Sequence, residues 1–71
     1  MHKLHVVSSV ITAVGYDEQS SMLEIEFRNG AVYEYSGVAV NTYKALMSAT
    51  SKGQYFDNWI RNGPYSCRRI S

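Results

Sequence analysis

The chain has 71 residues, 45% of them hydrophobic and 13% aromatic, with a formal net charge of +1. This length allows one small domain over residues 1–71, and the apolar content excludes a disordered chain. Cys67 is the only cysteine, which excludes an internal disulfide and the cysteine-based zinc patterns. No stretch is long and apolar enough to span a membrane, so we expect a cytoplasmic protein that has no membrane partner.

The first predicted element is a strand from about Val10 to Tyr16, which is rich in β-branched residues. Gly15 within it suggests a β-bulge or a close backbone approach, and the polar residues 17–21 end the strand. Apolar and charged residues then alternate strictly from Leu23 to Arg28, which predicts a second strand with one apolar face. Asn29-Gly30 predicts a hairpin turn into a third strand, which ends near Ser36.

The length of the hairpin loop decides which face carries the tyrosines of Tyr33-Glu34-Tyr35. A two-residue loop pairs Ile25 with Glu34 and turns that carboxylate towards the apolar face. A three-residue loop with a left-handed Gly30 instead places Glu34 opposite Glu24 on the exposed face. Two facing carboxylates cost at most ~1 kcal/mol, whereas burying an unpaired carboxylate costs several times more. We therefore predict the three-residue loop, with Tyr33 and Tyr35 mostly in the core.

Two helices are predicted after Gly37. The first has an apolar stripe at helical spacing, formed by Val40, Tyr43, Leu46 and Met47. The second begins at a capping box with Ser51 as N-cap and Gln54 as its partner, and ends at Asn62-Gly63-Pro64. The tail from Tyr65 to Ile70 alternates weakly and is a candidate edge strand. The predicted fold is α+β: a three-stranded antiparallel meander followed by two short helices packed on one face. A short C-terminal strand is an optional further element of this prediction.

No residue pattern supports an enzyme, a metal or a cofactor. His2 and His5 are the only histidines, and they lie at an end that we expect to fray, without a third metal ligand. Cys67, which precedes Arg68 and Arg69, is a candidate nucleophile, but no internal histidine is present to act as its base. We therefore predict no catalytic residues.

A basic surface is the remaining candidate. Residues 1–35 carry two basic and five acidic side chains, a net charge of −3, whereas residues 36–71 carry five and one, a net charge of +4. Cations interleaved with aromatic residues are typical of surfaces that bind single-stranded nucleic acid. The candidate RNA-binding residues are Lys52, Arg61, Arg68, Arg69, Tyr55 and Tyr65. The alternative interpretation is that Trp59 and Phe56 belong to the core and that the arginines are simply solvated.

The acidic face of the sheet would repel phosphates, because it displays Glu24, Glu26 and Glu34. An RNA site is therefore expected on the second helix and the tail, and not on the sheet.

The assembled motifs resemble the KTSC domain, a module named for the C-terminus of some lysyl-tRNA synthetases and also found as a stand-alone bacterial protein. The matching pieces are Val7-Ser8-Ser9, Val14-Gly15-Tyr16-Asp17, Leu23 to Phe27 with Asn29-Gly30, Tyr33-Glu34-Tyr35, and Ser51 to Phe56 with Ile60-Arg61. Val38-Ala39 departs from the valine-proline that is usual in the family. The resemblance implies a β-then-α domain and brings no known activity, although the synthetase context suggests RNA binding.

The sequence thus favours a non-enzymatic binding module, with RNA or tRNA as the leading partner. The alternative is a protein-interaction or self-associating module, because an exposed sheet edge recruits a partner strand and a thin core favours a homodimer.

Overall fold

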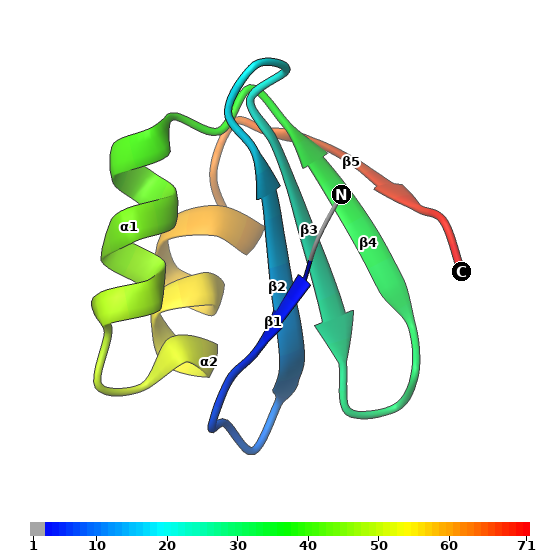
Figure 1. Cartoon of the computed structure of the whole chain (residues 1–71), viewed down its shortest axis with the longest axis vertical. Helices are drawn as coiled ribbons and strands as arrows, with labels where there is room; N and C mark the ends of the chain where they lie inside the picture. The colour runs from blue at the N-terminus through cyan, green and yellow to red at the C-terminus, as the bar shows by residue number, and fades with distance from the viewer. Residues whose placement is uncertain (1–2) are drawn as a thin grey trace.

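The strands form one antiparallel sheet, and the helices pack on one of its faces (Figure 1). The structure, a computed structural model, describes residues 3–71. The five strands are neighbours in sequence order: β1 (Lys3–His5), β2 (Ile11–Asp17), β3 (Met22–Phe27), β4 (Val32–Ser36) and β5 (Ser66–Arg69). Between β4 and β5 lie α1 (Val40–Ser48), α2 (Lys52–Tyr55) and η1 (Phe56–Arg61), a wider π-helical continuation of α2. The fold is therefore α+β, as predicted.

The sheet is larger than the predicted meander, which corresponds to β2, β3 and β4. The candidate tail strand is present as β5, paired with β4. The prediction of a frayed N-terminus is wrong from Lys3 onward, because Lys3–His5 pairs with β2 and occupies backbone groups that an open edge would expose. His2 lies outside the described residues. The irregular pairing in β2 falls between Ile11 and Ala13, whereas Gly15 pairs regularly with Lys3 and Glu24. Of the two alternatives for Gly15, the bulge is therefore not found at this position.

The hairpin register is the predicted one. Ile25 pairs with Tyr33, and the glutamates at positions 24 and 34 face each other. The Phe27 amide donates to the Ala31 carbonyl at 2.9 Å, and Gly30 takes a φ of 91° in the left-handed region. The loop therefore spans three residues, and it turns the tyrosines towards the helices.

The core lies between the sheet and the helices. Its buried members are Ile11, Val14, Leu23, Ile25, Tyr35, Val38, Leu46, Phe56 and Ile60. Ser51 caps α2 as predicted, since its Oγ accepts a hydrogen bond from the Gln54 amide at 3.3 Å. Phe56 and Ile60 take the two sheet-facing positions of η1, whereas Trp59 is 64% exposed. The alternative interpretation is thus right for Phe56 and wrong for Trp59.

The outer face of the described sheet carries a row of paired residues that is charged on every strand except β2. Lys3 lies beside Gly15, followed by Glu24, Glu34 and Arg68. The Lys3 ammonium contacts Glu26 at 2.9 Å and Glu24 at 3.3 Å, while Arg68 contacts Glu34 at 2.9 Å. The hydrogen bond that the Lys3 ammonium donates to the Glu26 carboxylate raises the pKa of Lys3. A cation at each end of the row thus offsets the repulsion between the facing glutamates.

Candidate functional site

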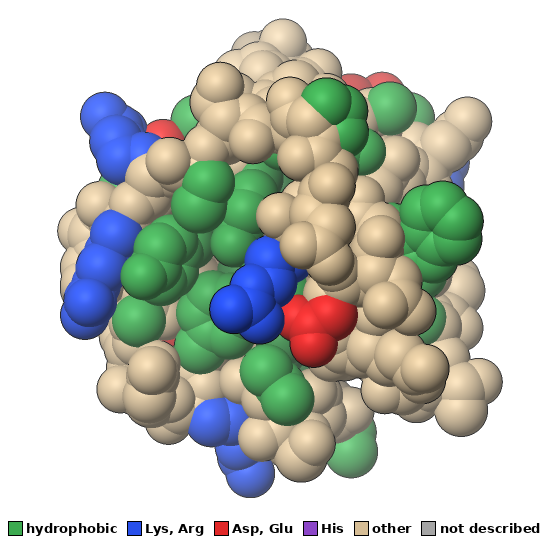
Figure 2. All heavy atoms as spheres, turned by 180° about the vertical axis from the view of Figure 1, so that it is seen from behind, with side chains coloured by type: hydrophobic (Ala, Val, Ile, Leu, Met, Phe, Trp, Pro, Cys, Tyr) green, Lys and Arg blue, Asp and Glu red, His purple; other side chains and the backbone are tan. Residues whose placement is uncertain are grey.

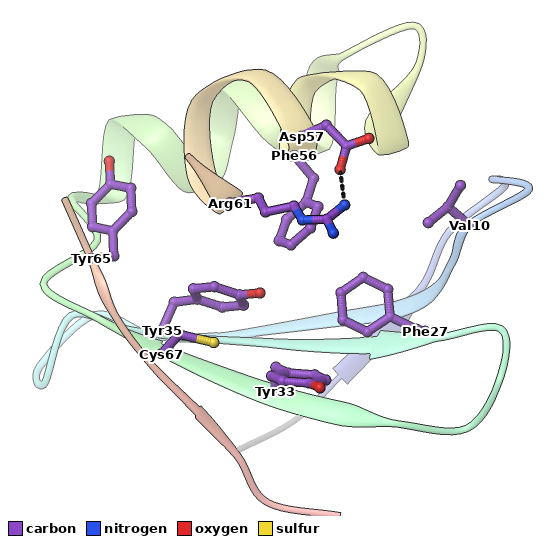
Figure 3. Close-up of a pocket in the computed structure, with 9 residues that line it drawn as sticks. All are labelled: Val10, Phe27, Tyr33, Tyr35, Phe56, Asp57, Arg61, Tyr65 and Cys67. Carbon is purple, nitrogen blue, oxygen red and sulfur yellow. Dashed lines mark hydrogen bonds and ion pairs between the residues drawn. The ribbon is translucent and has the colours of Figure 1, made fainter. Parts of the chain in front are cut away.

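A pocket opens between the inner face of the sheet and η1 (Figure 3). Its volume is about 630 Å³, within the range of small-ligand sites. The lining residues are Val10, Phe27, Tyr33, Tyr35, Phe56, Asp57, Arg61, Tyr65 and Cys67. In Figure 2, hydrophobic side chains gather in a hollow beside a touching basic and acidic side chain, with further basic side chains towards the margin of this face. The pocket is therefore an open aromatic hollow on a largely basic face.

The aromatic walls follow directly from the hairpin register. Phe27 on β3 and the two tyrosines of β4 point to the inner face because side chains alternate along a strand. The ring of Phe27 meets Tyr33 and Phe56 edge-on, at centroid distances of 5.7 and 5.3 Å. Tyr35 packs edge-on against Phe56 at 5.5 Å. These contacts hold the walls in fixed orientations, so the pocket is formed before any ligand arrives.

Tyr35 supplies a polar group to the pocket. Its side chain is only 6% exposed, and its hydroxyl points into the cavity (Figure 3). Burial raises the pKa of this hydroxyl far above its usual value, with a further contribution from the nearby Cys67 thiol. The Cys67 thiol, a weak hydrogen-bonding group, lies within bonding reach of this hydroxyl. Tyr35 thus presents a neutral, available O–H donor at ordinary pH.

Asp57 and Arg61 border the pocket from η1, one helical turn apart. The guanidinium contacts the carboxylate at 3.3 Å, while the two side chains remain 68% and 52% exposed. Pairs with this exposure contribute little to stability, so both partners remain open to other contacts. The rim therefore offers one cation and one carboxylate acceptor.

The structure brings together some of the six predicted site residues and separates the others. Arg61 and Tyr65 line the pocket. Arg69 lies opposite Tyr33 in the ladder, and so on the pocket side of the sheet. Its neighbour Arg68 projects from the outer face, where it pairs with Glu34.

The other two predicted residues lie away from the pocket. Lys52 borders a second, more polar crevice of about 440 Å³ and donates to the Ala49 carbonyl at 3.1 Å. Tyr55 lies beside the exposed Trp59, with ring centroids 6.4 Å apart. The six residues therefore do not form one continuous surface.

The sequence analysis missed the contribution of the sheet to this pocket. Tyr35 is buried as predicted and Tyr33 is half-buried, yet both line the cavity. The argument against an RNA site on the sheet concerned its acidic outer face, whereas Tyr33 and Tyr35 lie on the inner face. The available signal was the two phenol hydroxyls, since buried tyrosines need either a partner or an opening to solvent.

Metal-binding clusters and membrane-spanning helices are both absent from the described residues. Within residues 3–71, no group of three His, Cys, Asp or Glu side chains is arranged to hold a metal ion. In the same part of the chain, no helix has the length and apolar character needed to cross a bilayer.

Comparison with known proteins places this fold and its motifs in a family. A family model described as the KTSC domain matches residues 7–65. The chain belongs to the KTSC domain family. The crystal structure of a KTSC domain protein from Yersinia pestis has the same fold, with a TM-score of 0.93 and 43% sequence identity, over 99% of this chain and 97% of that one.

Two further relatives differ in how much of their own length is similar to this chain. An uncharacterized protein from Stutzerimonas stutzeri is 34% identical over 70 residues, which is 99% of both chains. The lysine–tRNA ligase of Nostoc punctiforme is 38% identical over 63 residues, which is 89% of this chain and 11% of the ligase. The segment similar to this chain thus makes up nearly all of one relative and a small part of the other.

Two of the motifs that carry the KTSC resemblance meet beside the second crevice. The Ser8 hydroxyl accepts hydrogen bonds from the amides of Val10 and Ile11, both at 3.1 Å. Gly53 is buried against Val10, where an added Cβ would lie 3.2 Å from a valine methyl. These motif residues therefore hold the β1–β2 loop against the start of α2, which is a structural role.

Proposed function

We propose that this KTSC domain is a non-enzymatic, cytoplasmic module that binds single-stranded RNA over the pocket face. The observation that carries the proposal is the preformed aromatic pocket with Arg61 on its rim. Proteins that bind single strands stack unpaired bases on aromatic side chains and neutralise the backbone with neighbouring cations. A duplex offers no such base faces, so a single-stranded segment is the matching form of RNA.

The distribution of charge supports an anionic partner on this face. Glu24, Glu26 and Glu34 lie on the outer face, where Lys3 and Arg68 pair with them. The exposed Asp17 and Glu18 belong to the end of β2 and the turn after it. Among the described residues, Asp57 is thus the only carboxylate that lines the pocket. Arg61 and Arg69 are the predicted phosphate contacts that remain on this side.

The relationship to lysine–tRNA ligases supports the same partner. A segment similar to this chain belongs to a ligase that acts on tRNA, although it makes up only 11% of that protein. A small domain attached to such an enzyme encounters RNA with single-stranded loops and ends. We therefore extend the proposal to tRNA as one natural form of the ligand.

The test is a titration of fluorescein-labelled single-stranded RNA followed by anisotropy, at about 50 mM and about 200 mM salt. Arg61→Ala is expected to weaken binding several-fold and to lower the salt slope by about 0.7, the value for one phosphate contact on a single strand. Arg68→Ala is the matched control, because it removes the same charge from the outer face. Absence of binding at low salt, or an equal loss in both variants, contradicts the proposal.

A second candidate function is self-association or binding of a protein partner through the free edges of β1 and β5. Apolar side chains near β1 favour it, since Leu4 is 48% and Val7 96% exposed. Sedimentation velocity across a wide range of concentrations tests this function. A single monomeric species throughout excludes the homodimer, whereas a shift that Leu4→Lys abolishes supports pairing at the β1 edge.

A further inference from the structure

The pocket contains hydrogen-bonding groups that the protein itself leaves open. The Tyr35 hydroxyl points into the cavity, where its neighbour is the weakly hydrogen-bonding Cys67 thiol. Across from it, Asp57 and Arg61 project from η1 and contact each other at 3.3 Å while remaining largely exposed (Figure 3). An aromatic slot with donors on both walls and one carboxylate acceptor suits a planar ring that carries both donors and acceptors. An apolar ring would leave the Tyr35 hydroxyl desolvated, with only the weak Cys67 thiol as its partner.

Resting on the proposed function, we infer that the pocket takes one unstacked nucleobase and that Asp57 selects bases with an exocyclic amino group over uracil. An ionised carboxylate only accepts hydrogen bonds, and the amino group of cytosine is a good donor to it. The ring nitrogen beside that amino group is an acceptor, which suits the Tyr35 hydroxyl. Uracil has a carbonyl oxygen where cytosine has the amino group, and an N–H where cytosine has the acceptor nitrogen. In the same pose the carboxylate therefore faces an acceptor and the Tyr35 hydroxyl faces a donor, so both contacts are lost.

Arg61 has a separate role in this arrangement. Its contact with Asp57 is long and exposed, so an incoming base displaces it at little cost. The freed guanidinium remains at the rim, where the phosphate next to the bound base passes. The exchange converts a neutral ion pair into two ligand contacts: Asp57 reads the base and Arg61 neutralises the backbone. Charge complementarity thus favours a nucleotide over an apolar peptide as the occupant.

Cytosine and uracil give the sharpest comparison, because the two rings have the same size and differ mainly at this edge. Oligoribonucleotides of about ten residues cover one small binding domain. In competition anisotropy, the cytosine oligomer is expected to bind about fivefold more tightly than the uracil oligomer, or better, as one well-placed base contact allows. Asp57→Asn adds a donor to the site and is expected to reduce this ratio to less than about twofold. Glu18→Gln is the matched control, since it removes the same charge at the exposed turn and keeps the ratio.

Cys67 provides a second readout that does not depend on base preference. It is the only cysteine and it lines the pocket, so alkylation by iodoacetamide reports occupancy at this place. Saturating cytosine oligomer is expected to slow alkylation of Cys67 several-fold. Equal affinity for both oligomers, an unchanged ratio in Asp57→Asn, or an unprotected thiol overturns the inference while RNA binding itself stands. Failure of every oligomer to bind overturns both proposals.

Discussion

Gly63, at the end of the second helical segment, links the stability of the domain to the shape of the pocket. A Cβ at this position would lie 2.8 Å from the Trp59 carbonyl oxygen and 2.8 Å from Cε2 of Tyr65. The carbonyl belongs to the helix backbone and cannot yield, so the chain leading to Tyr65 has to move. Such overpacking costs ~1–3 kcal/mol, while alanine restricts the unfolded chain and returns ~0.4–1 kcal/mol. We therefore expect Gly63→Ala to lower the free energy of unfolding by about 1–2 kcal/mol.

Urea unfolding followed by circular dichroism measures this loss. For a small domain with a slope near 1 kcal/mol/M, the midpoint is expected to fall by about 1–2 M. Tyr65 lines the pocket, so Gly63→Ala is also expected to weaken RNA binding. Gly30→Ala is the control. The φ of 91° at this position imposes backbone strain on alanine and lowers stability, but the added Cβ has nothing within 4 Å, so the pocket and RNA binding are expected to be unchanged. An unchanged midpoint in Gly63→Ala refutes the packing argument.

Three further predictions concern the core, the outer face and the pH dependence. Ile25→Ala, at a fully buried position, is expected to lower the free energy of unfolding by ~2–5 kcal/mol and to lower the midpoint of a thermal melt strongly. A double-mutant cycle of Arg68→Ala and Glu34→Gln is expected to give a coupling free energy below ~1 kcal/mol, because the arginine is 75% exposed. A larger value contradicts the view of this pair as a weak surface ion pair. Folding raises the pKa of Tyr35 from the 10.0 of the free phenol, so the unfolded chain loses this proton first. Stability should thus fall as pH rises above about 10, and Tyr35→Phe should flatten the fall in melts across this range, with Lys3 contributing in the same direction.

The hairpin was predictable because two registers differed by a large and calculable cost. The free-energy cost of burying the Glu34 carboxylate in the core exceeds the cost of repulsion between two exposed glutamates. The observed pairing is the register with the lower cost. The strand β1 was not predictable in this way, since three residues are too few to show a period. Its pairing depends on the open edge of β2, which exists only once the sheet has formed.

The pocket was predictable only in part. Alternation places Tyr33 and Tyr35 on the inner face, but whether a helix covers them depends on how η1 packs. Arg68 and Arg69 are adjacent in sequence and were grouped as one basic site, whereas a strand turns neighbours to opposite faces. If the tail is taken as a strand, alternation places the Arg68 and Arg69 side chains on opposite faces of the sheet.

The one-residue difference in loop length thus decides more than the content of the core. The three-residue loop places Glu34 on the outer face, where Arg68 pairs with it. In the two-residue register, Glu34 would replace a tyrosine at the pocket and add a carboxylate to the face that carries Arg61. That face would repel a phosphate backbone and would lose an aromatic wall at the same time. The hairpin turn therefore sorts the charges of the sheet and determines which of its faces can receive an anionic ligand.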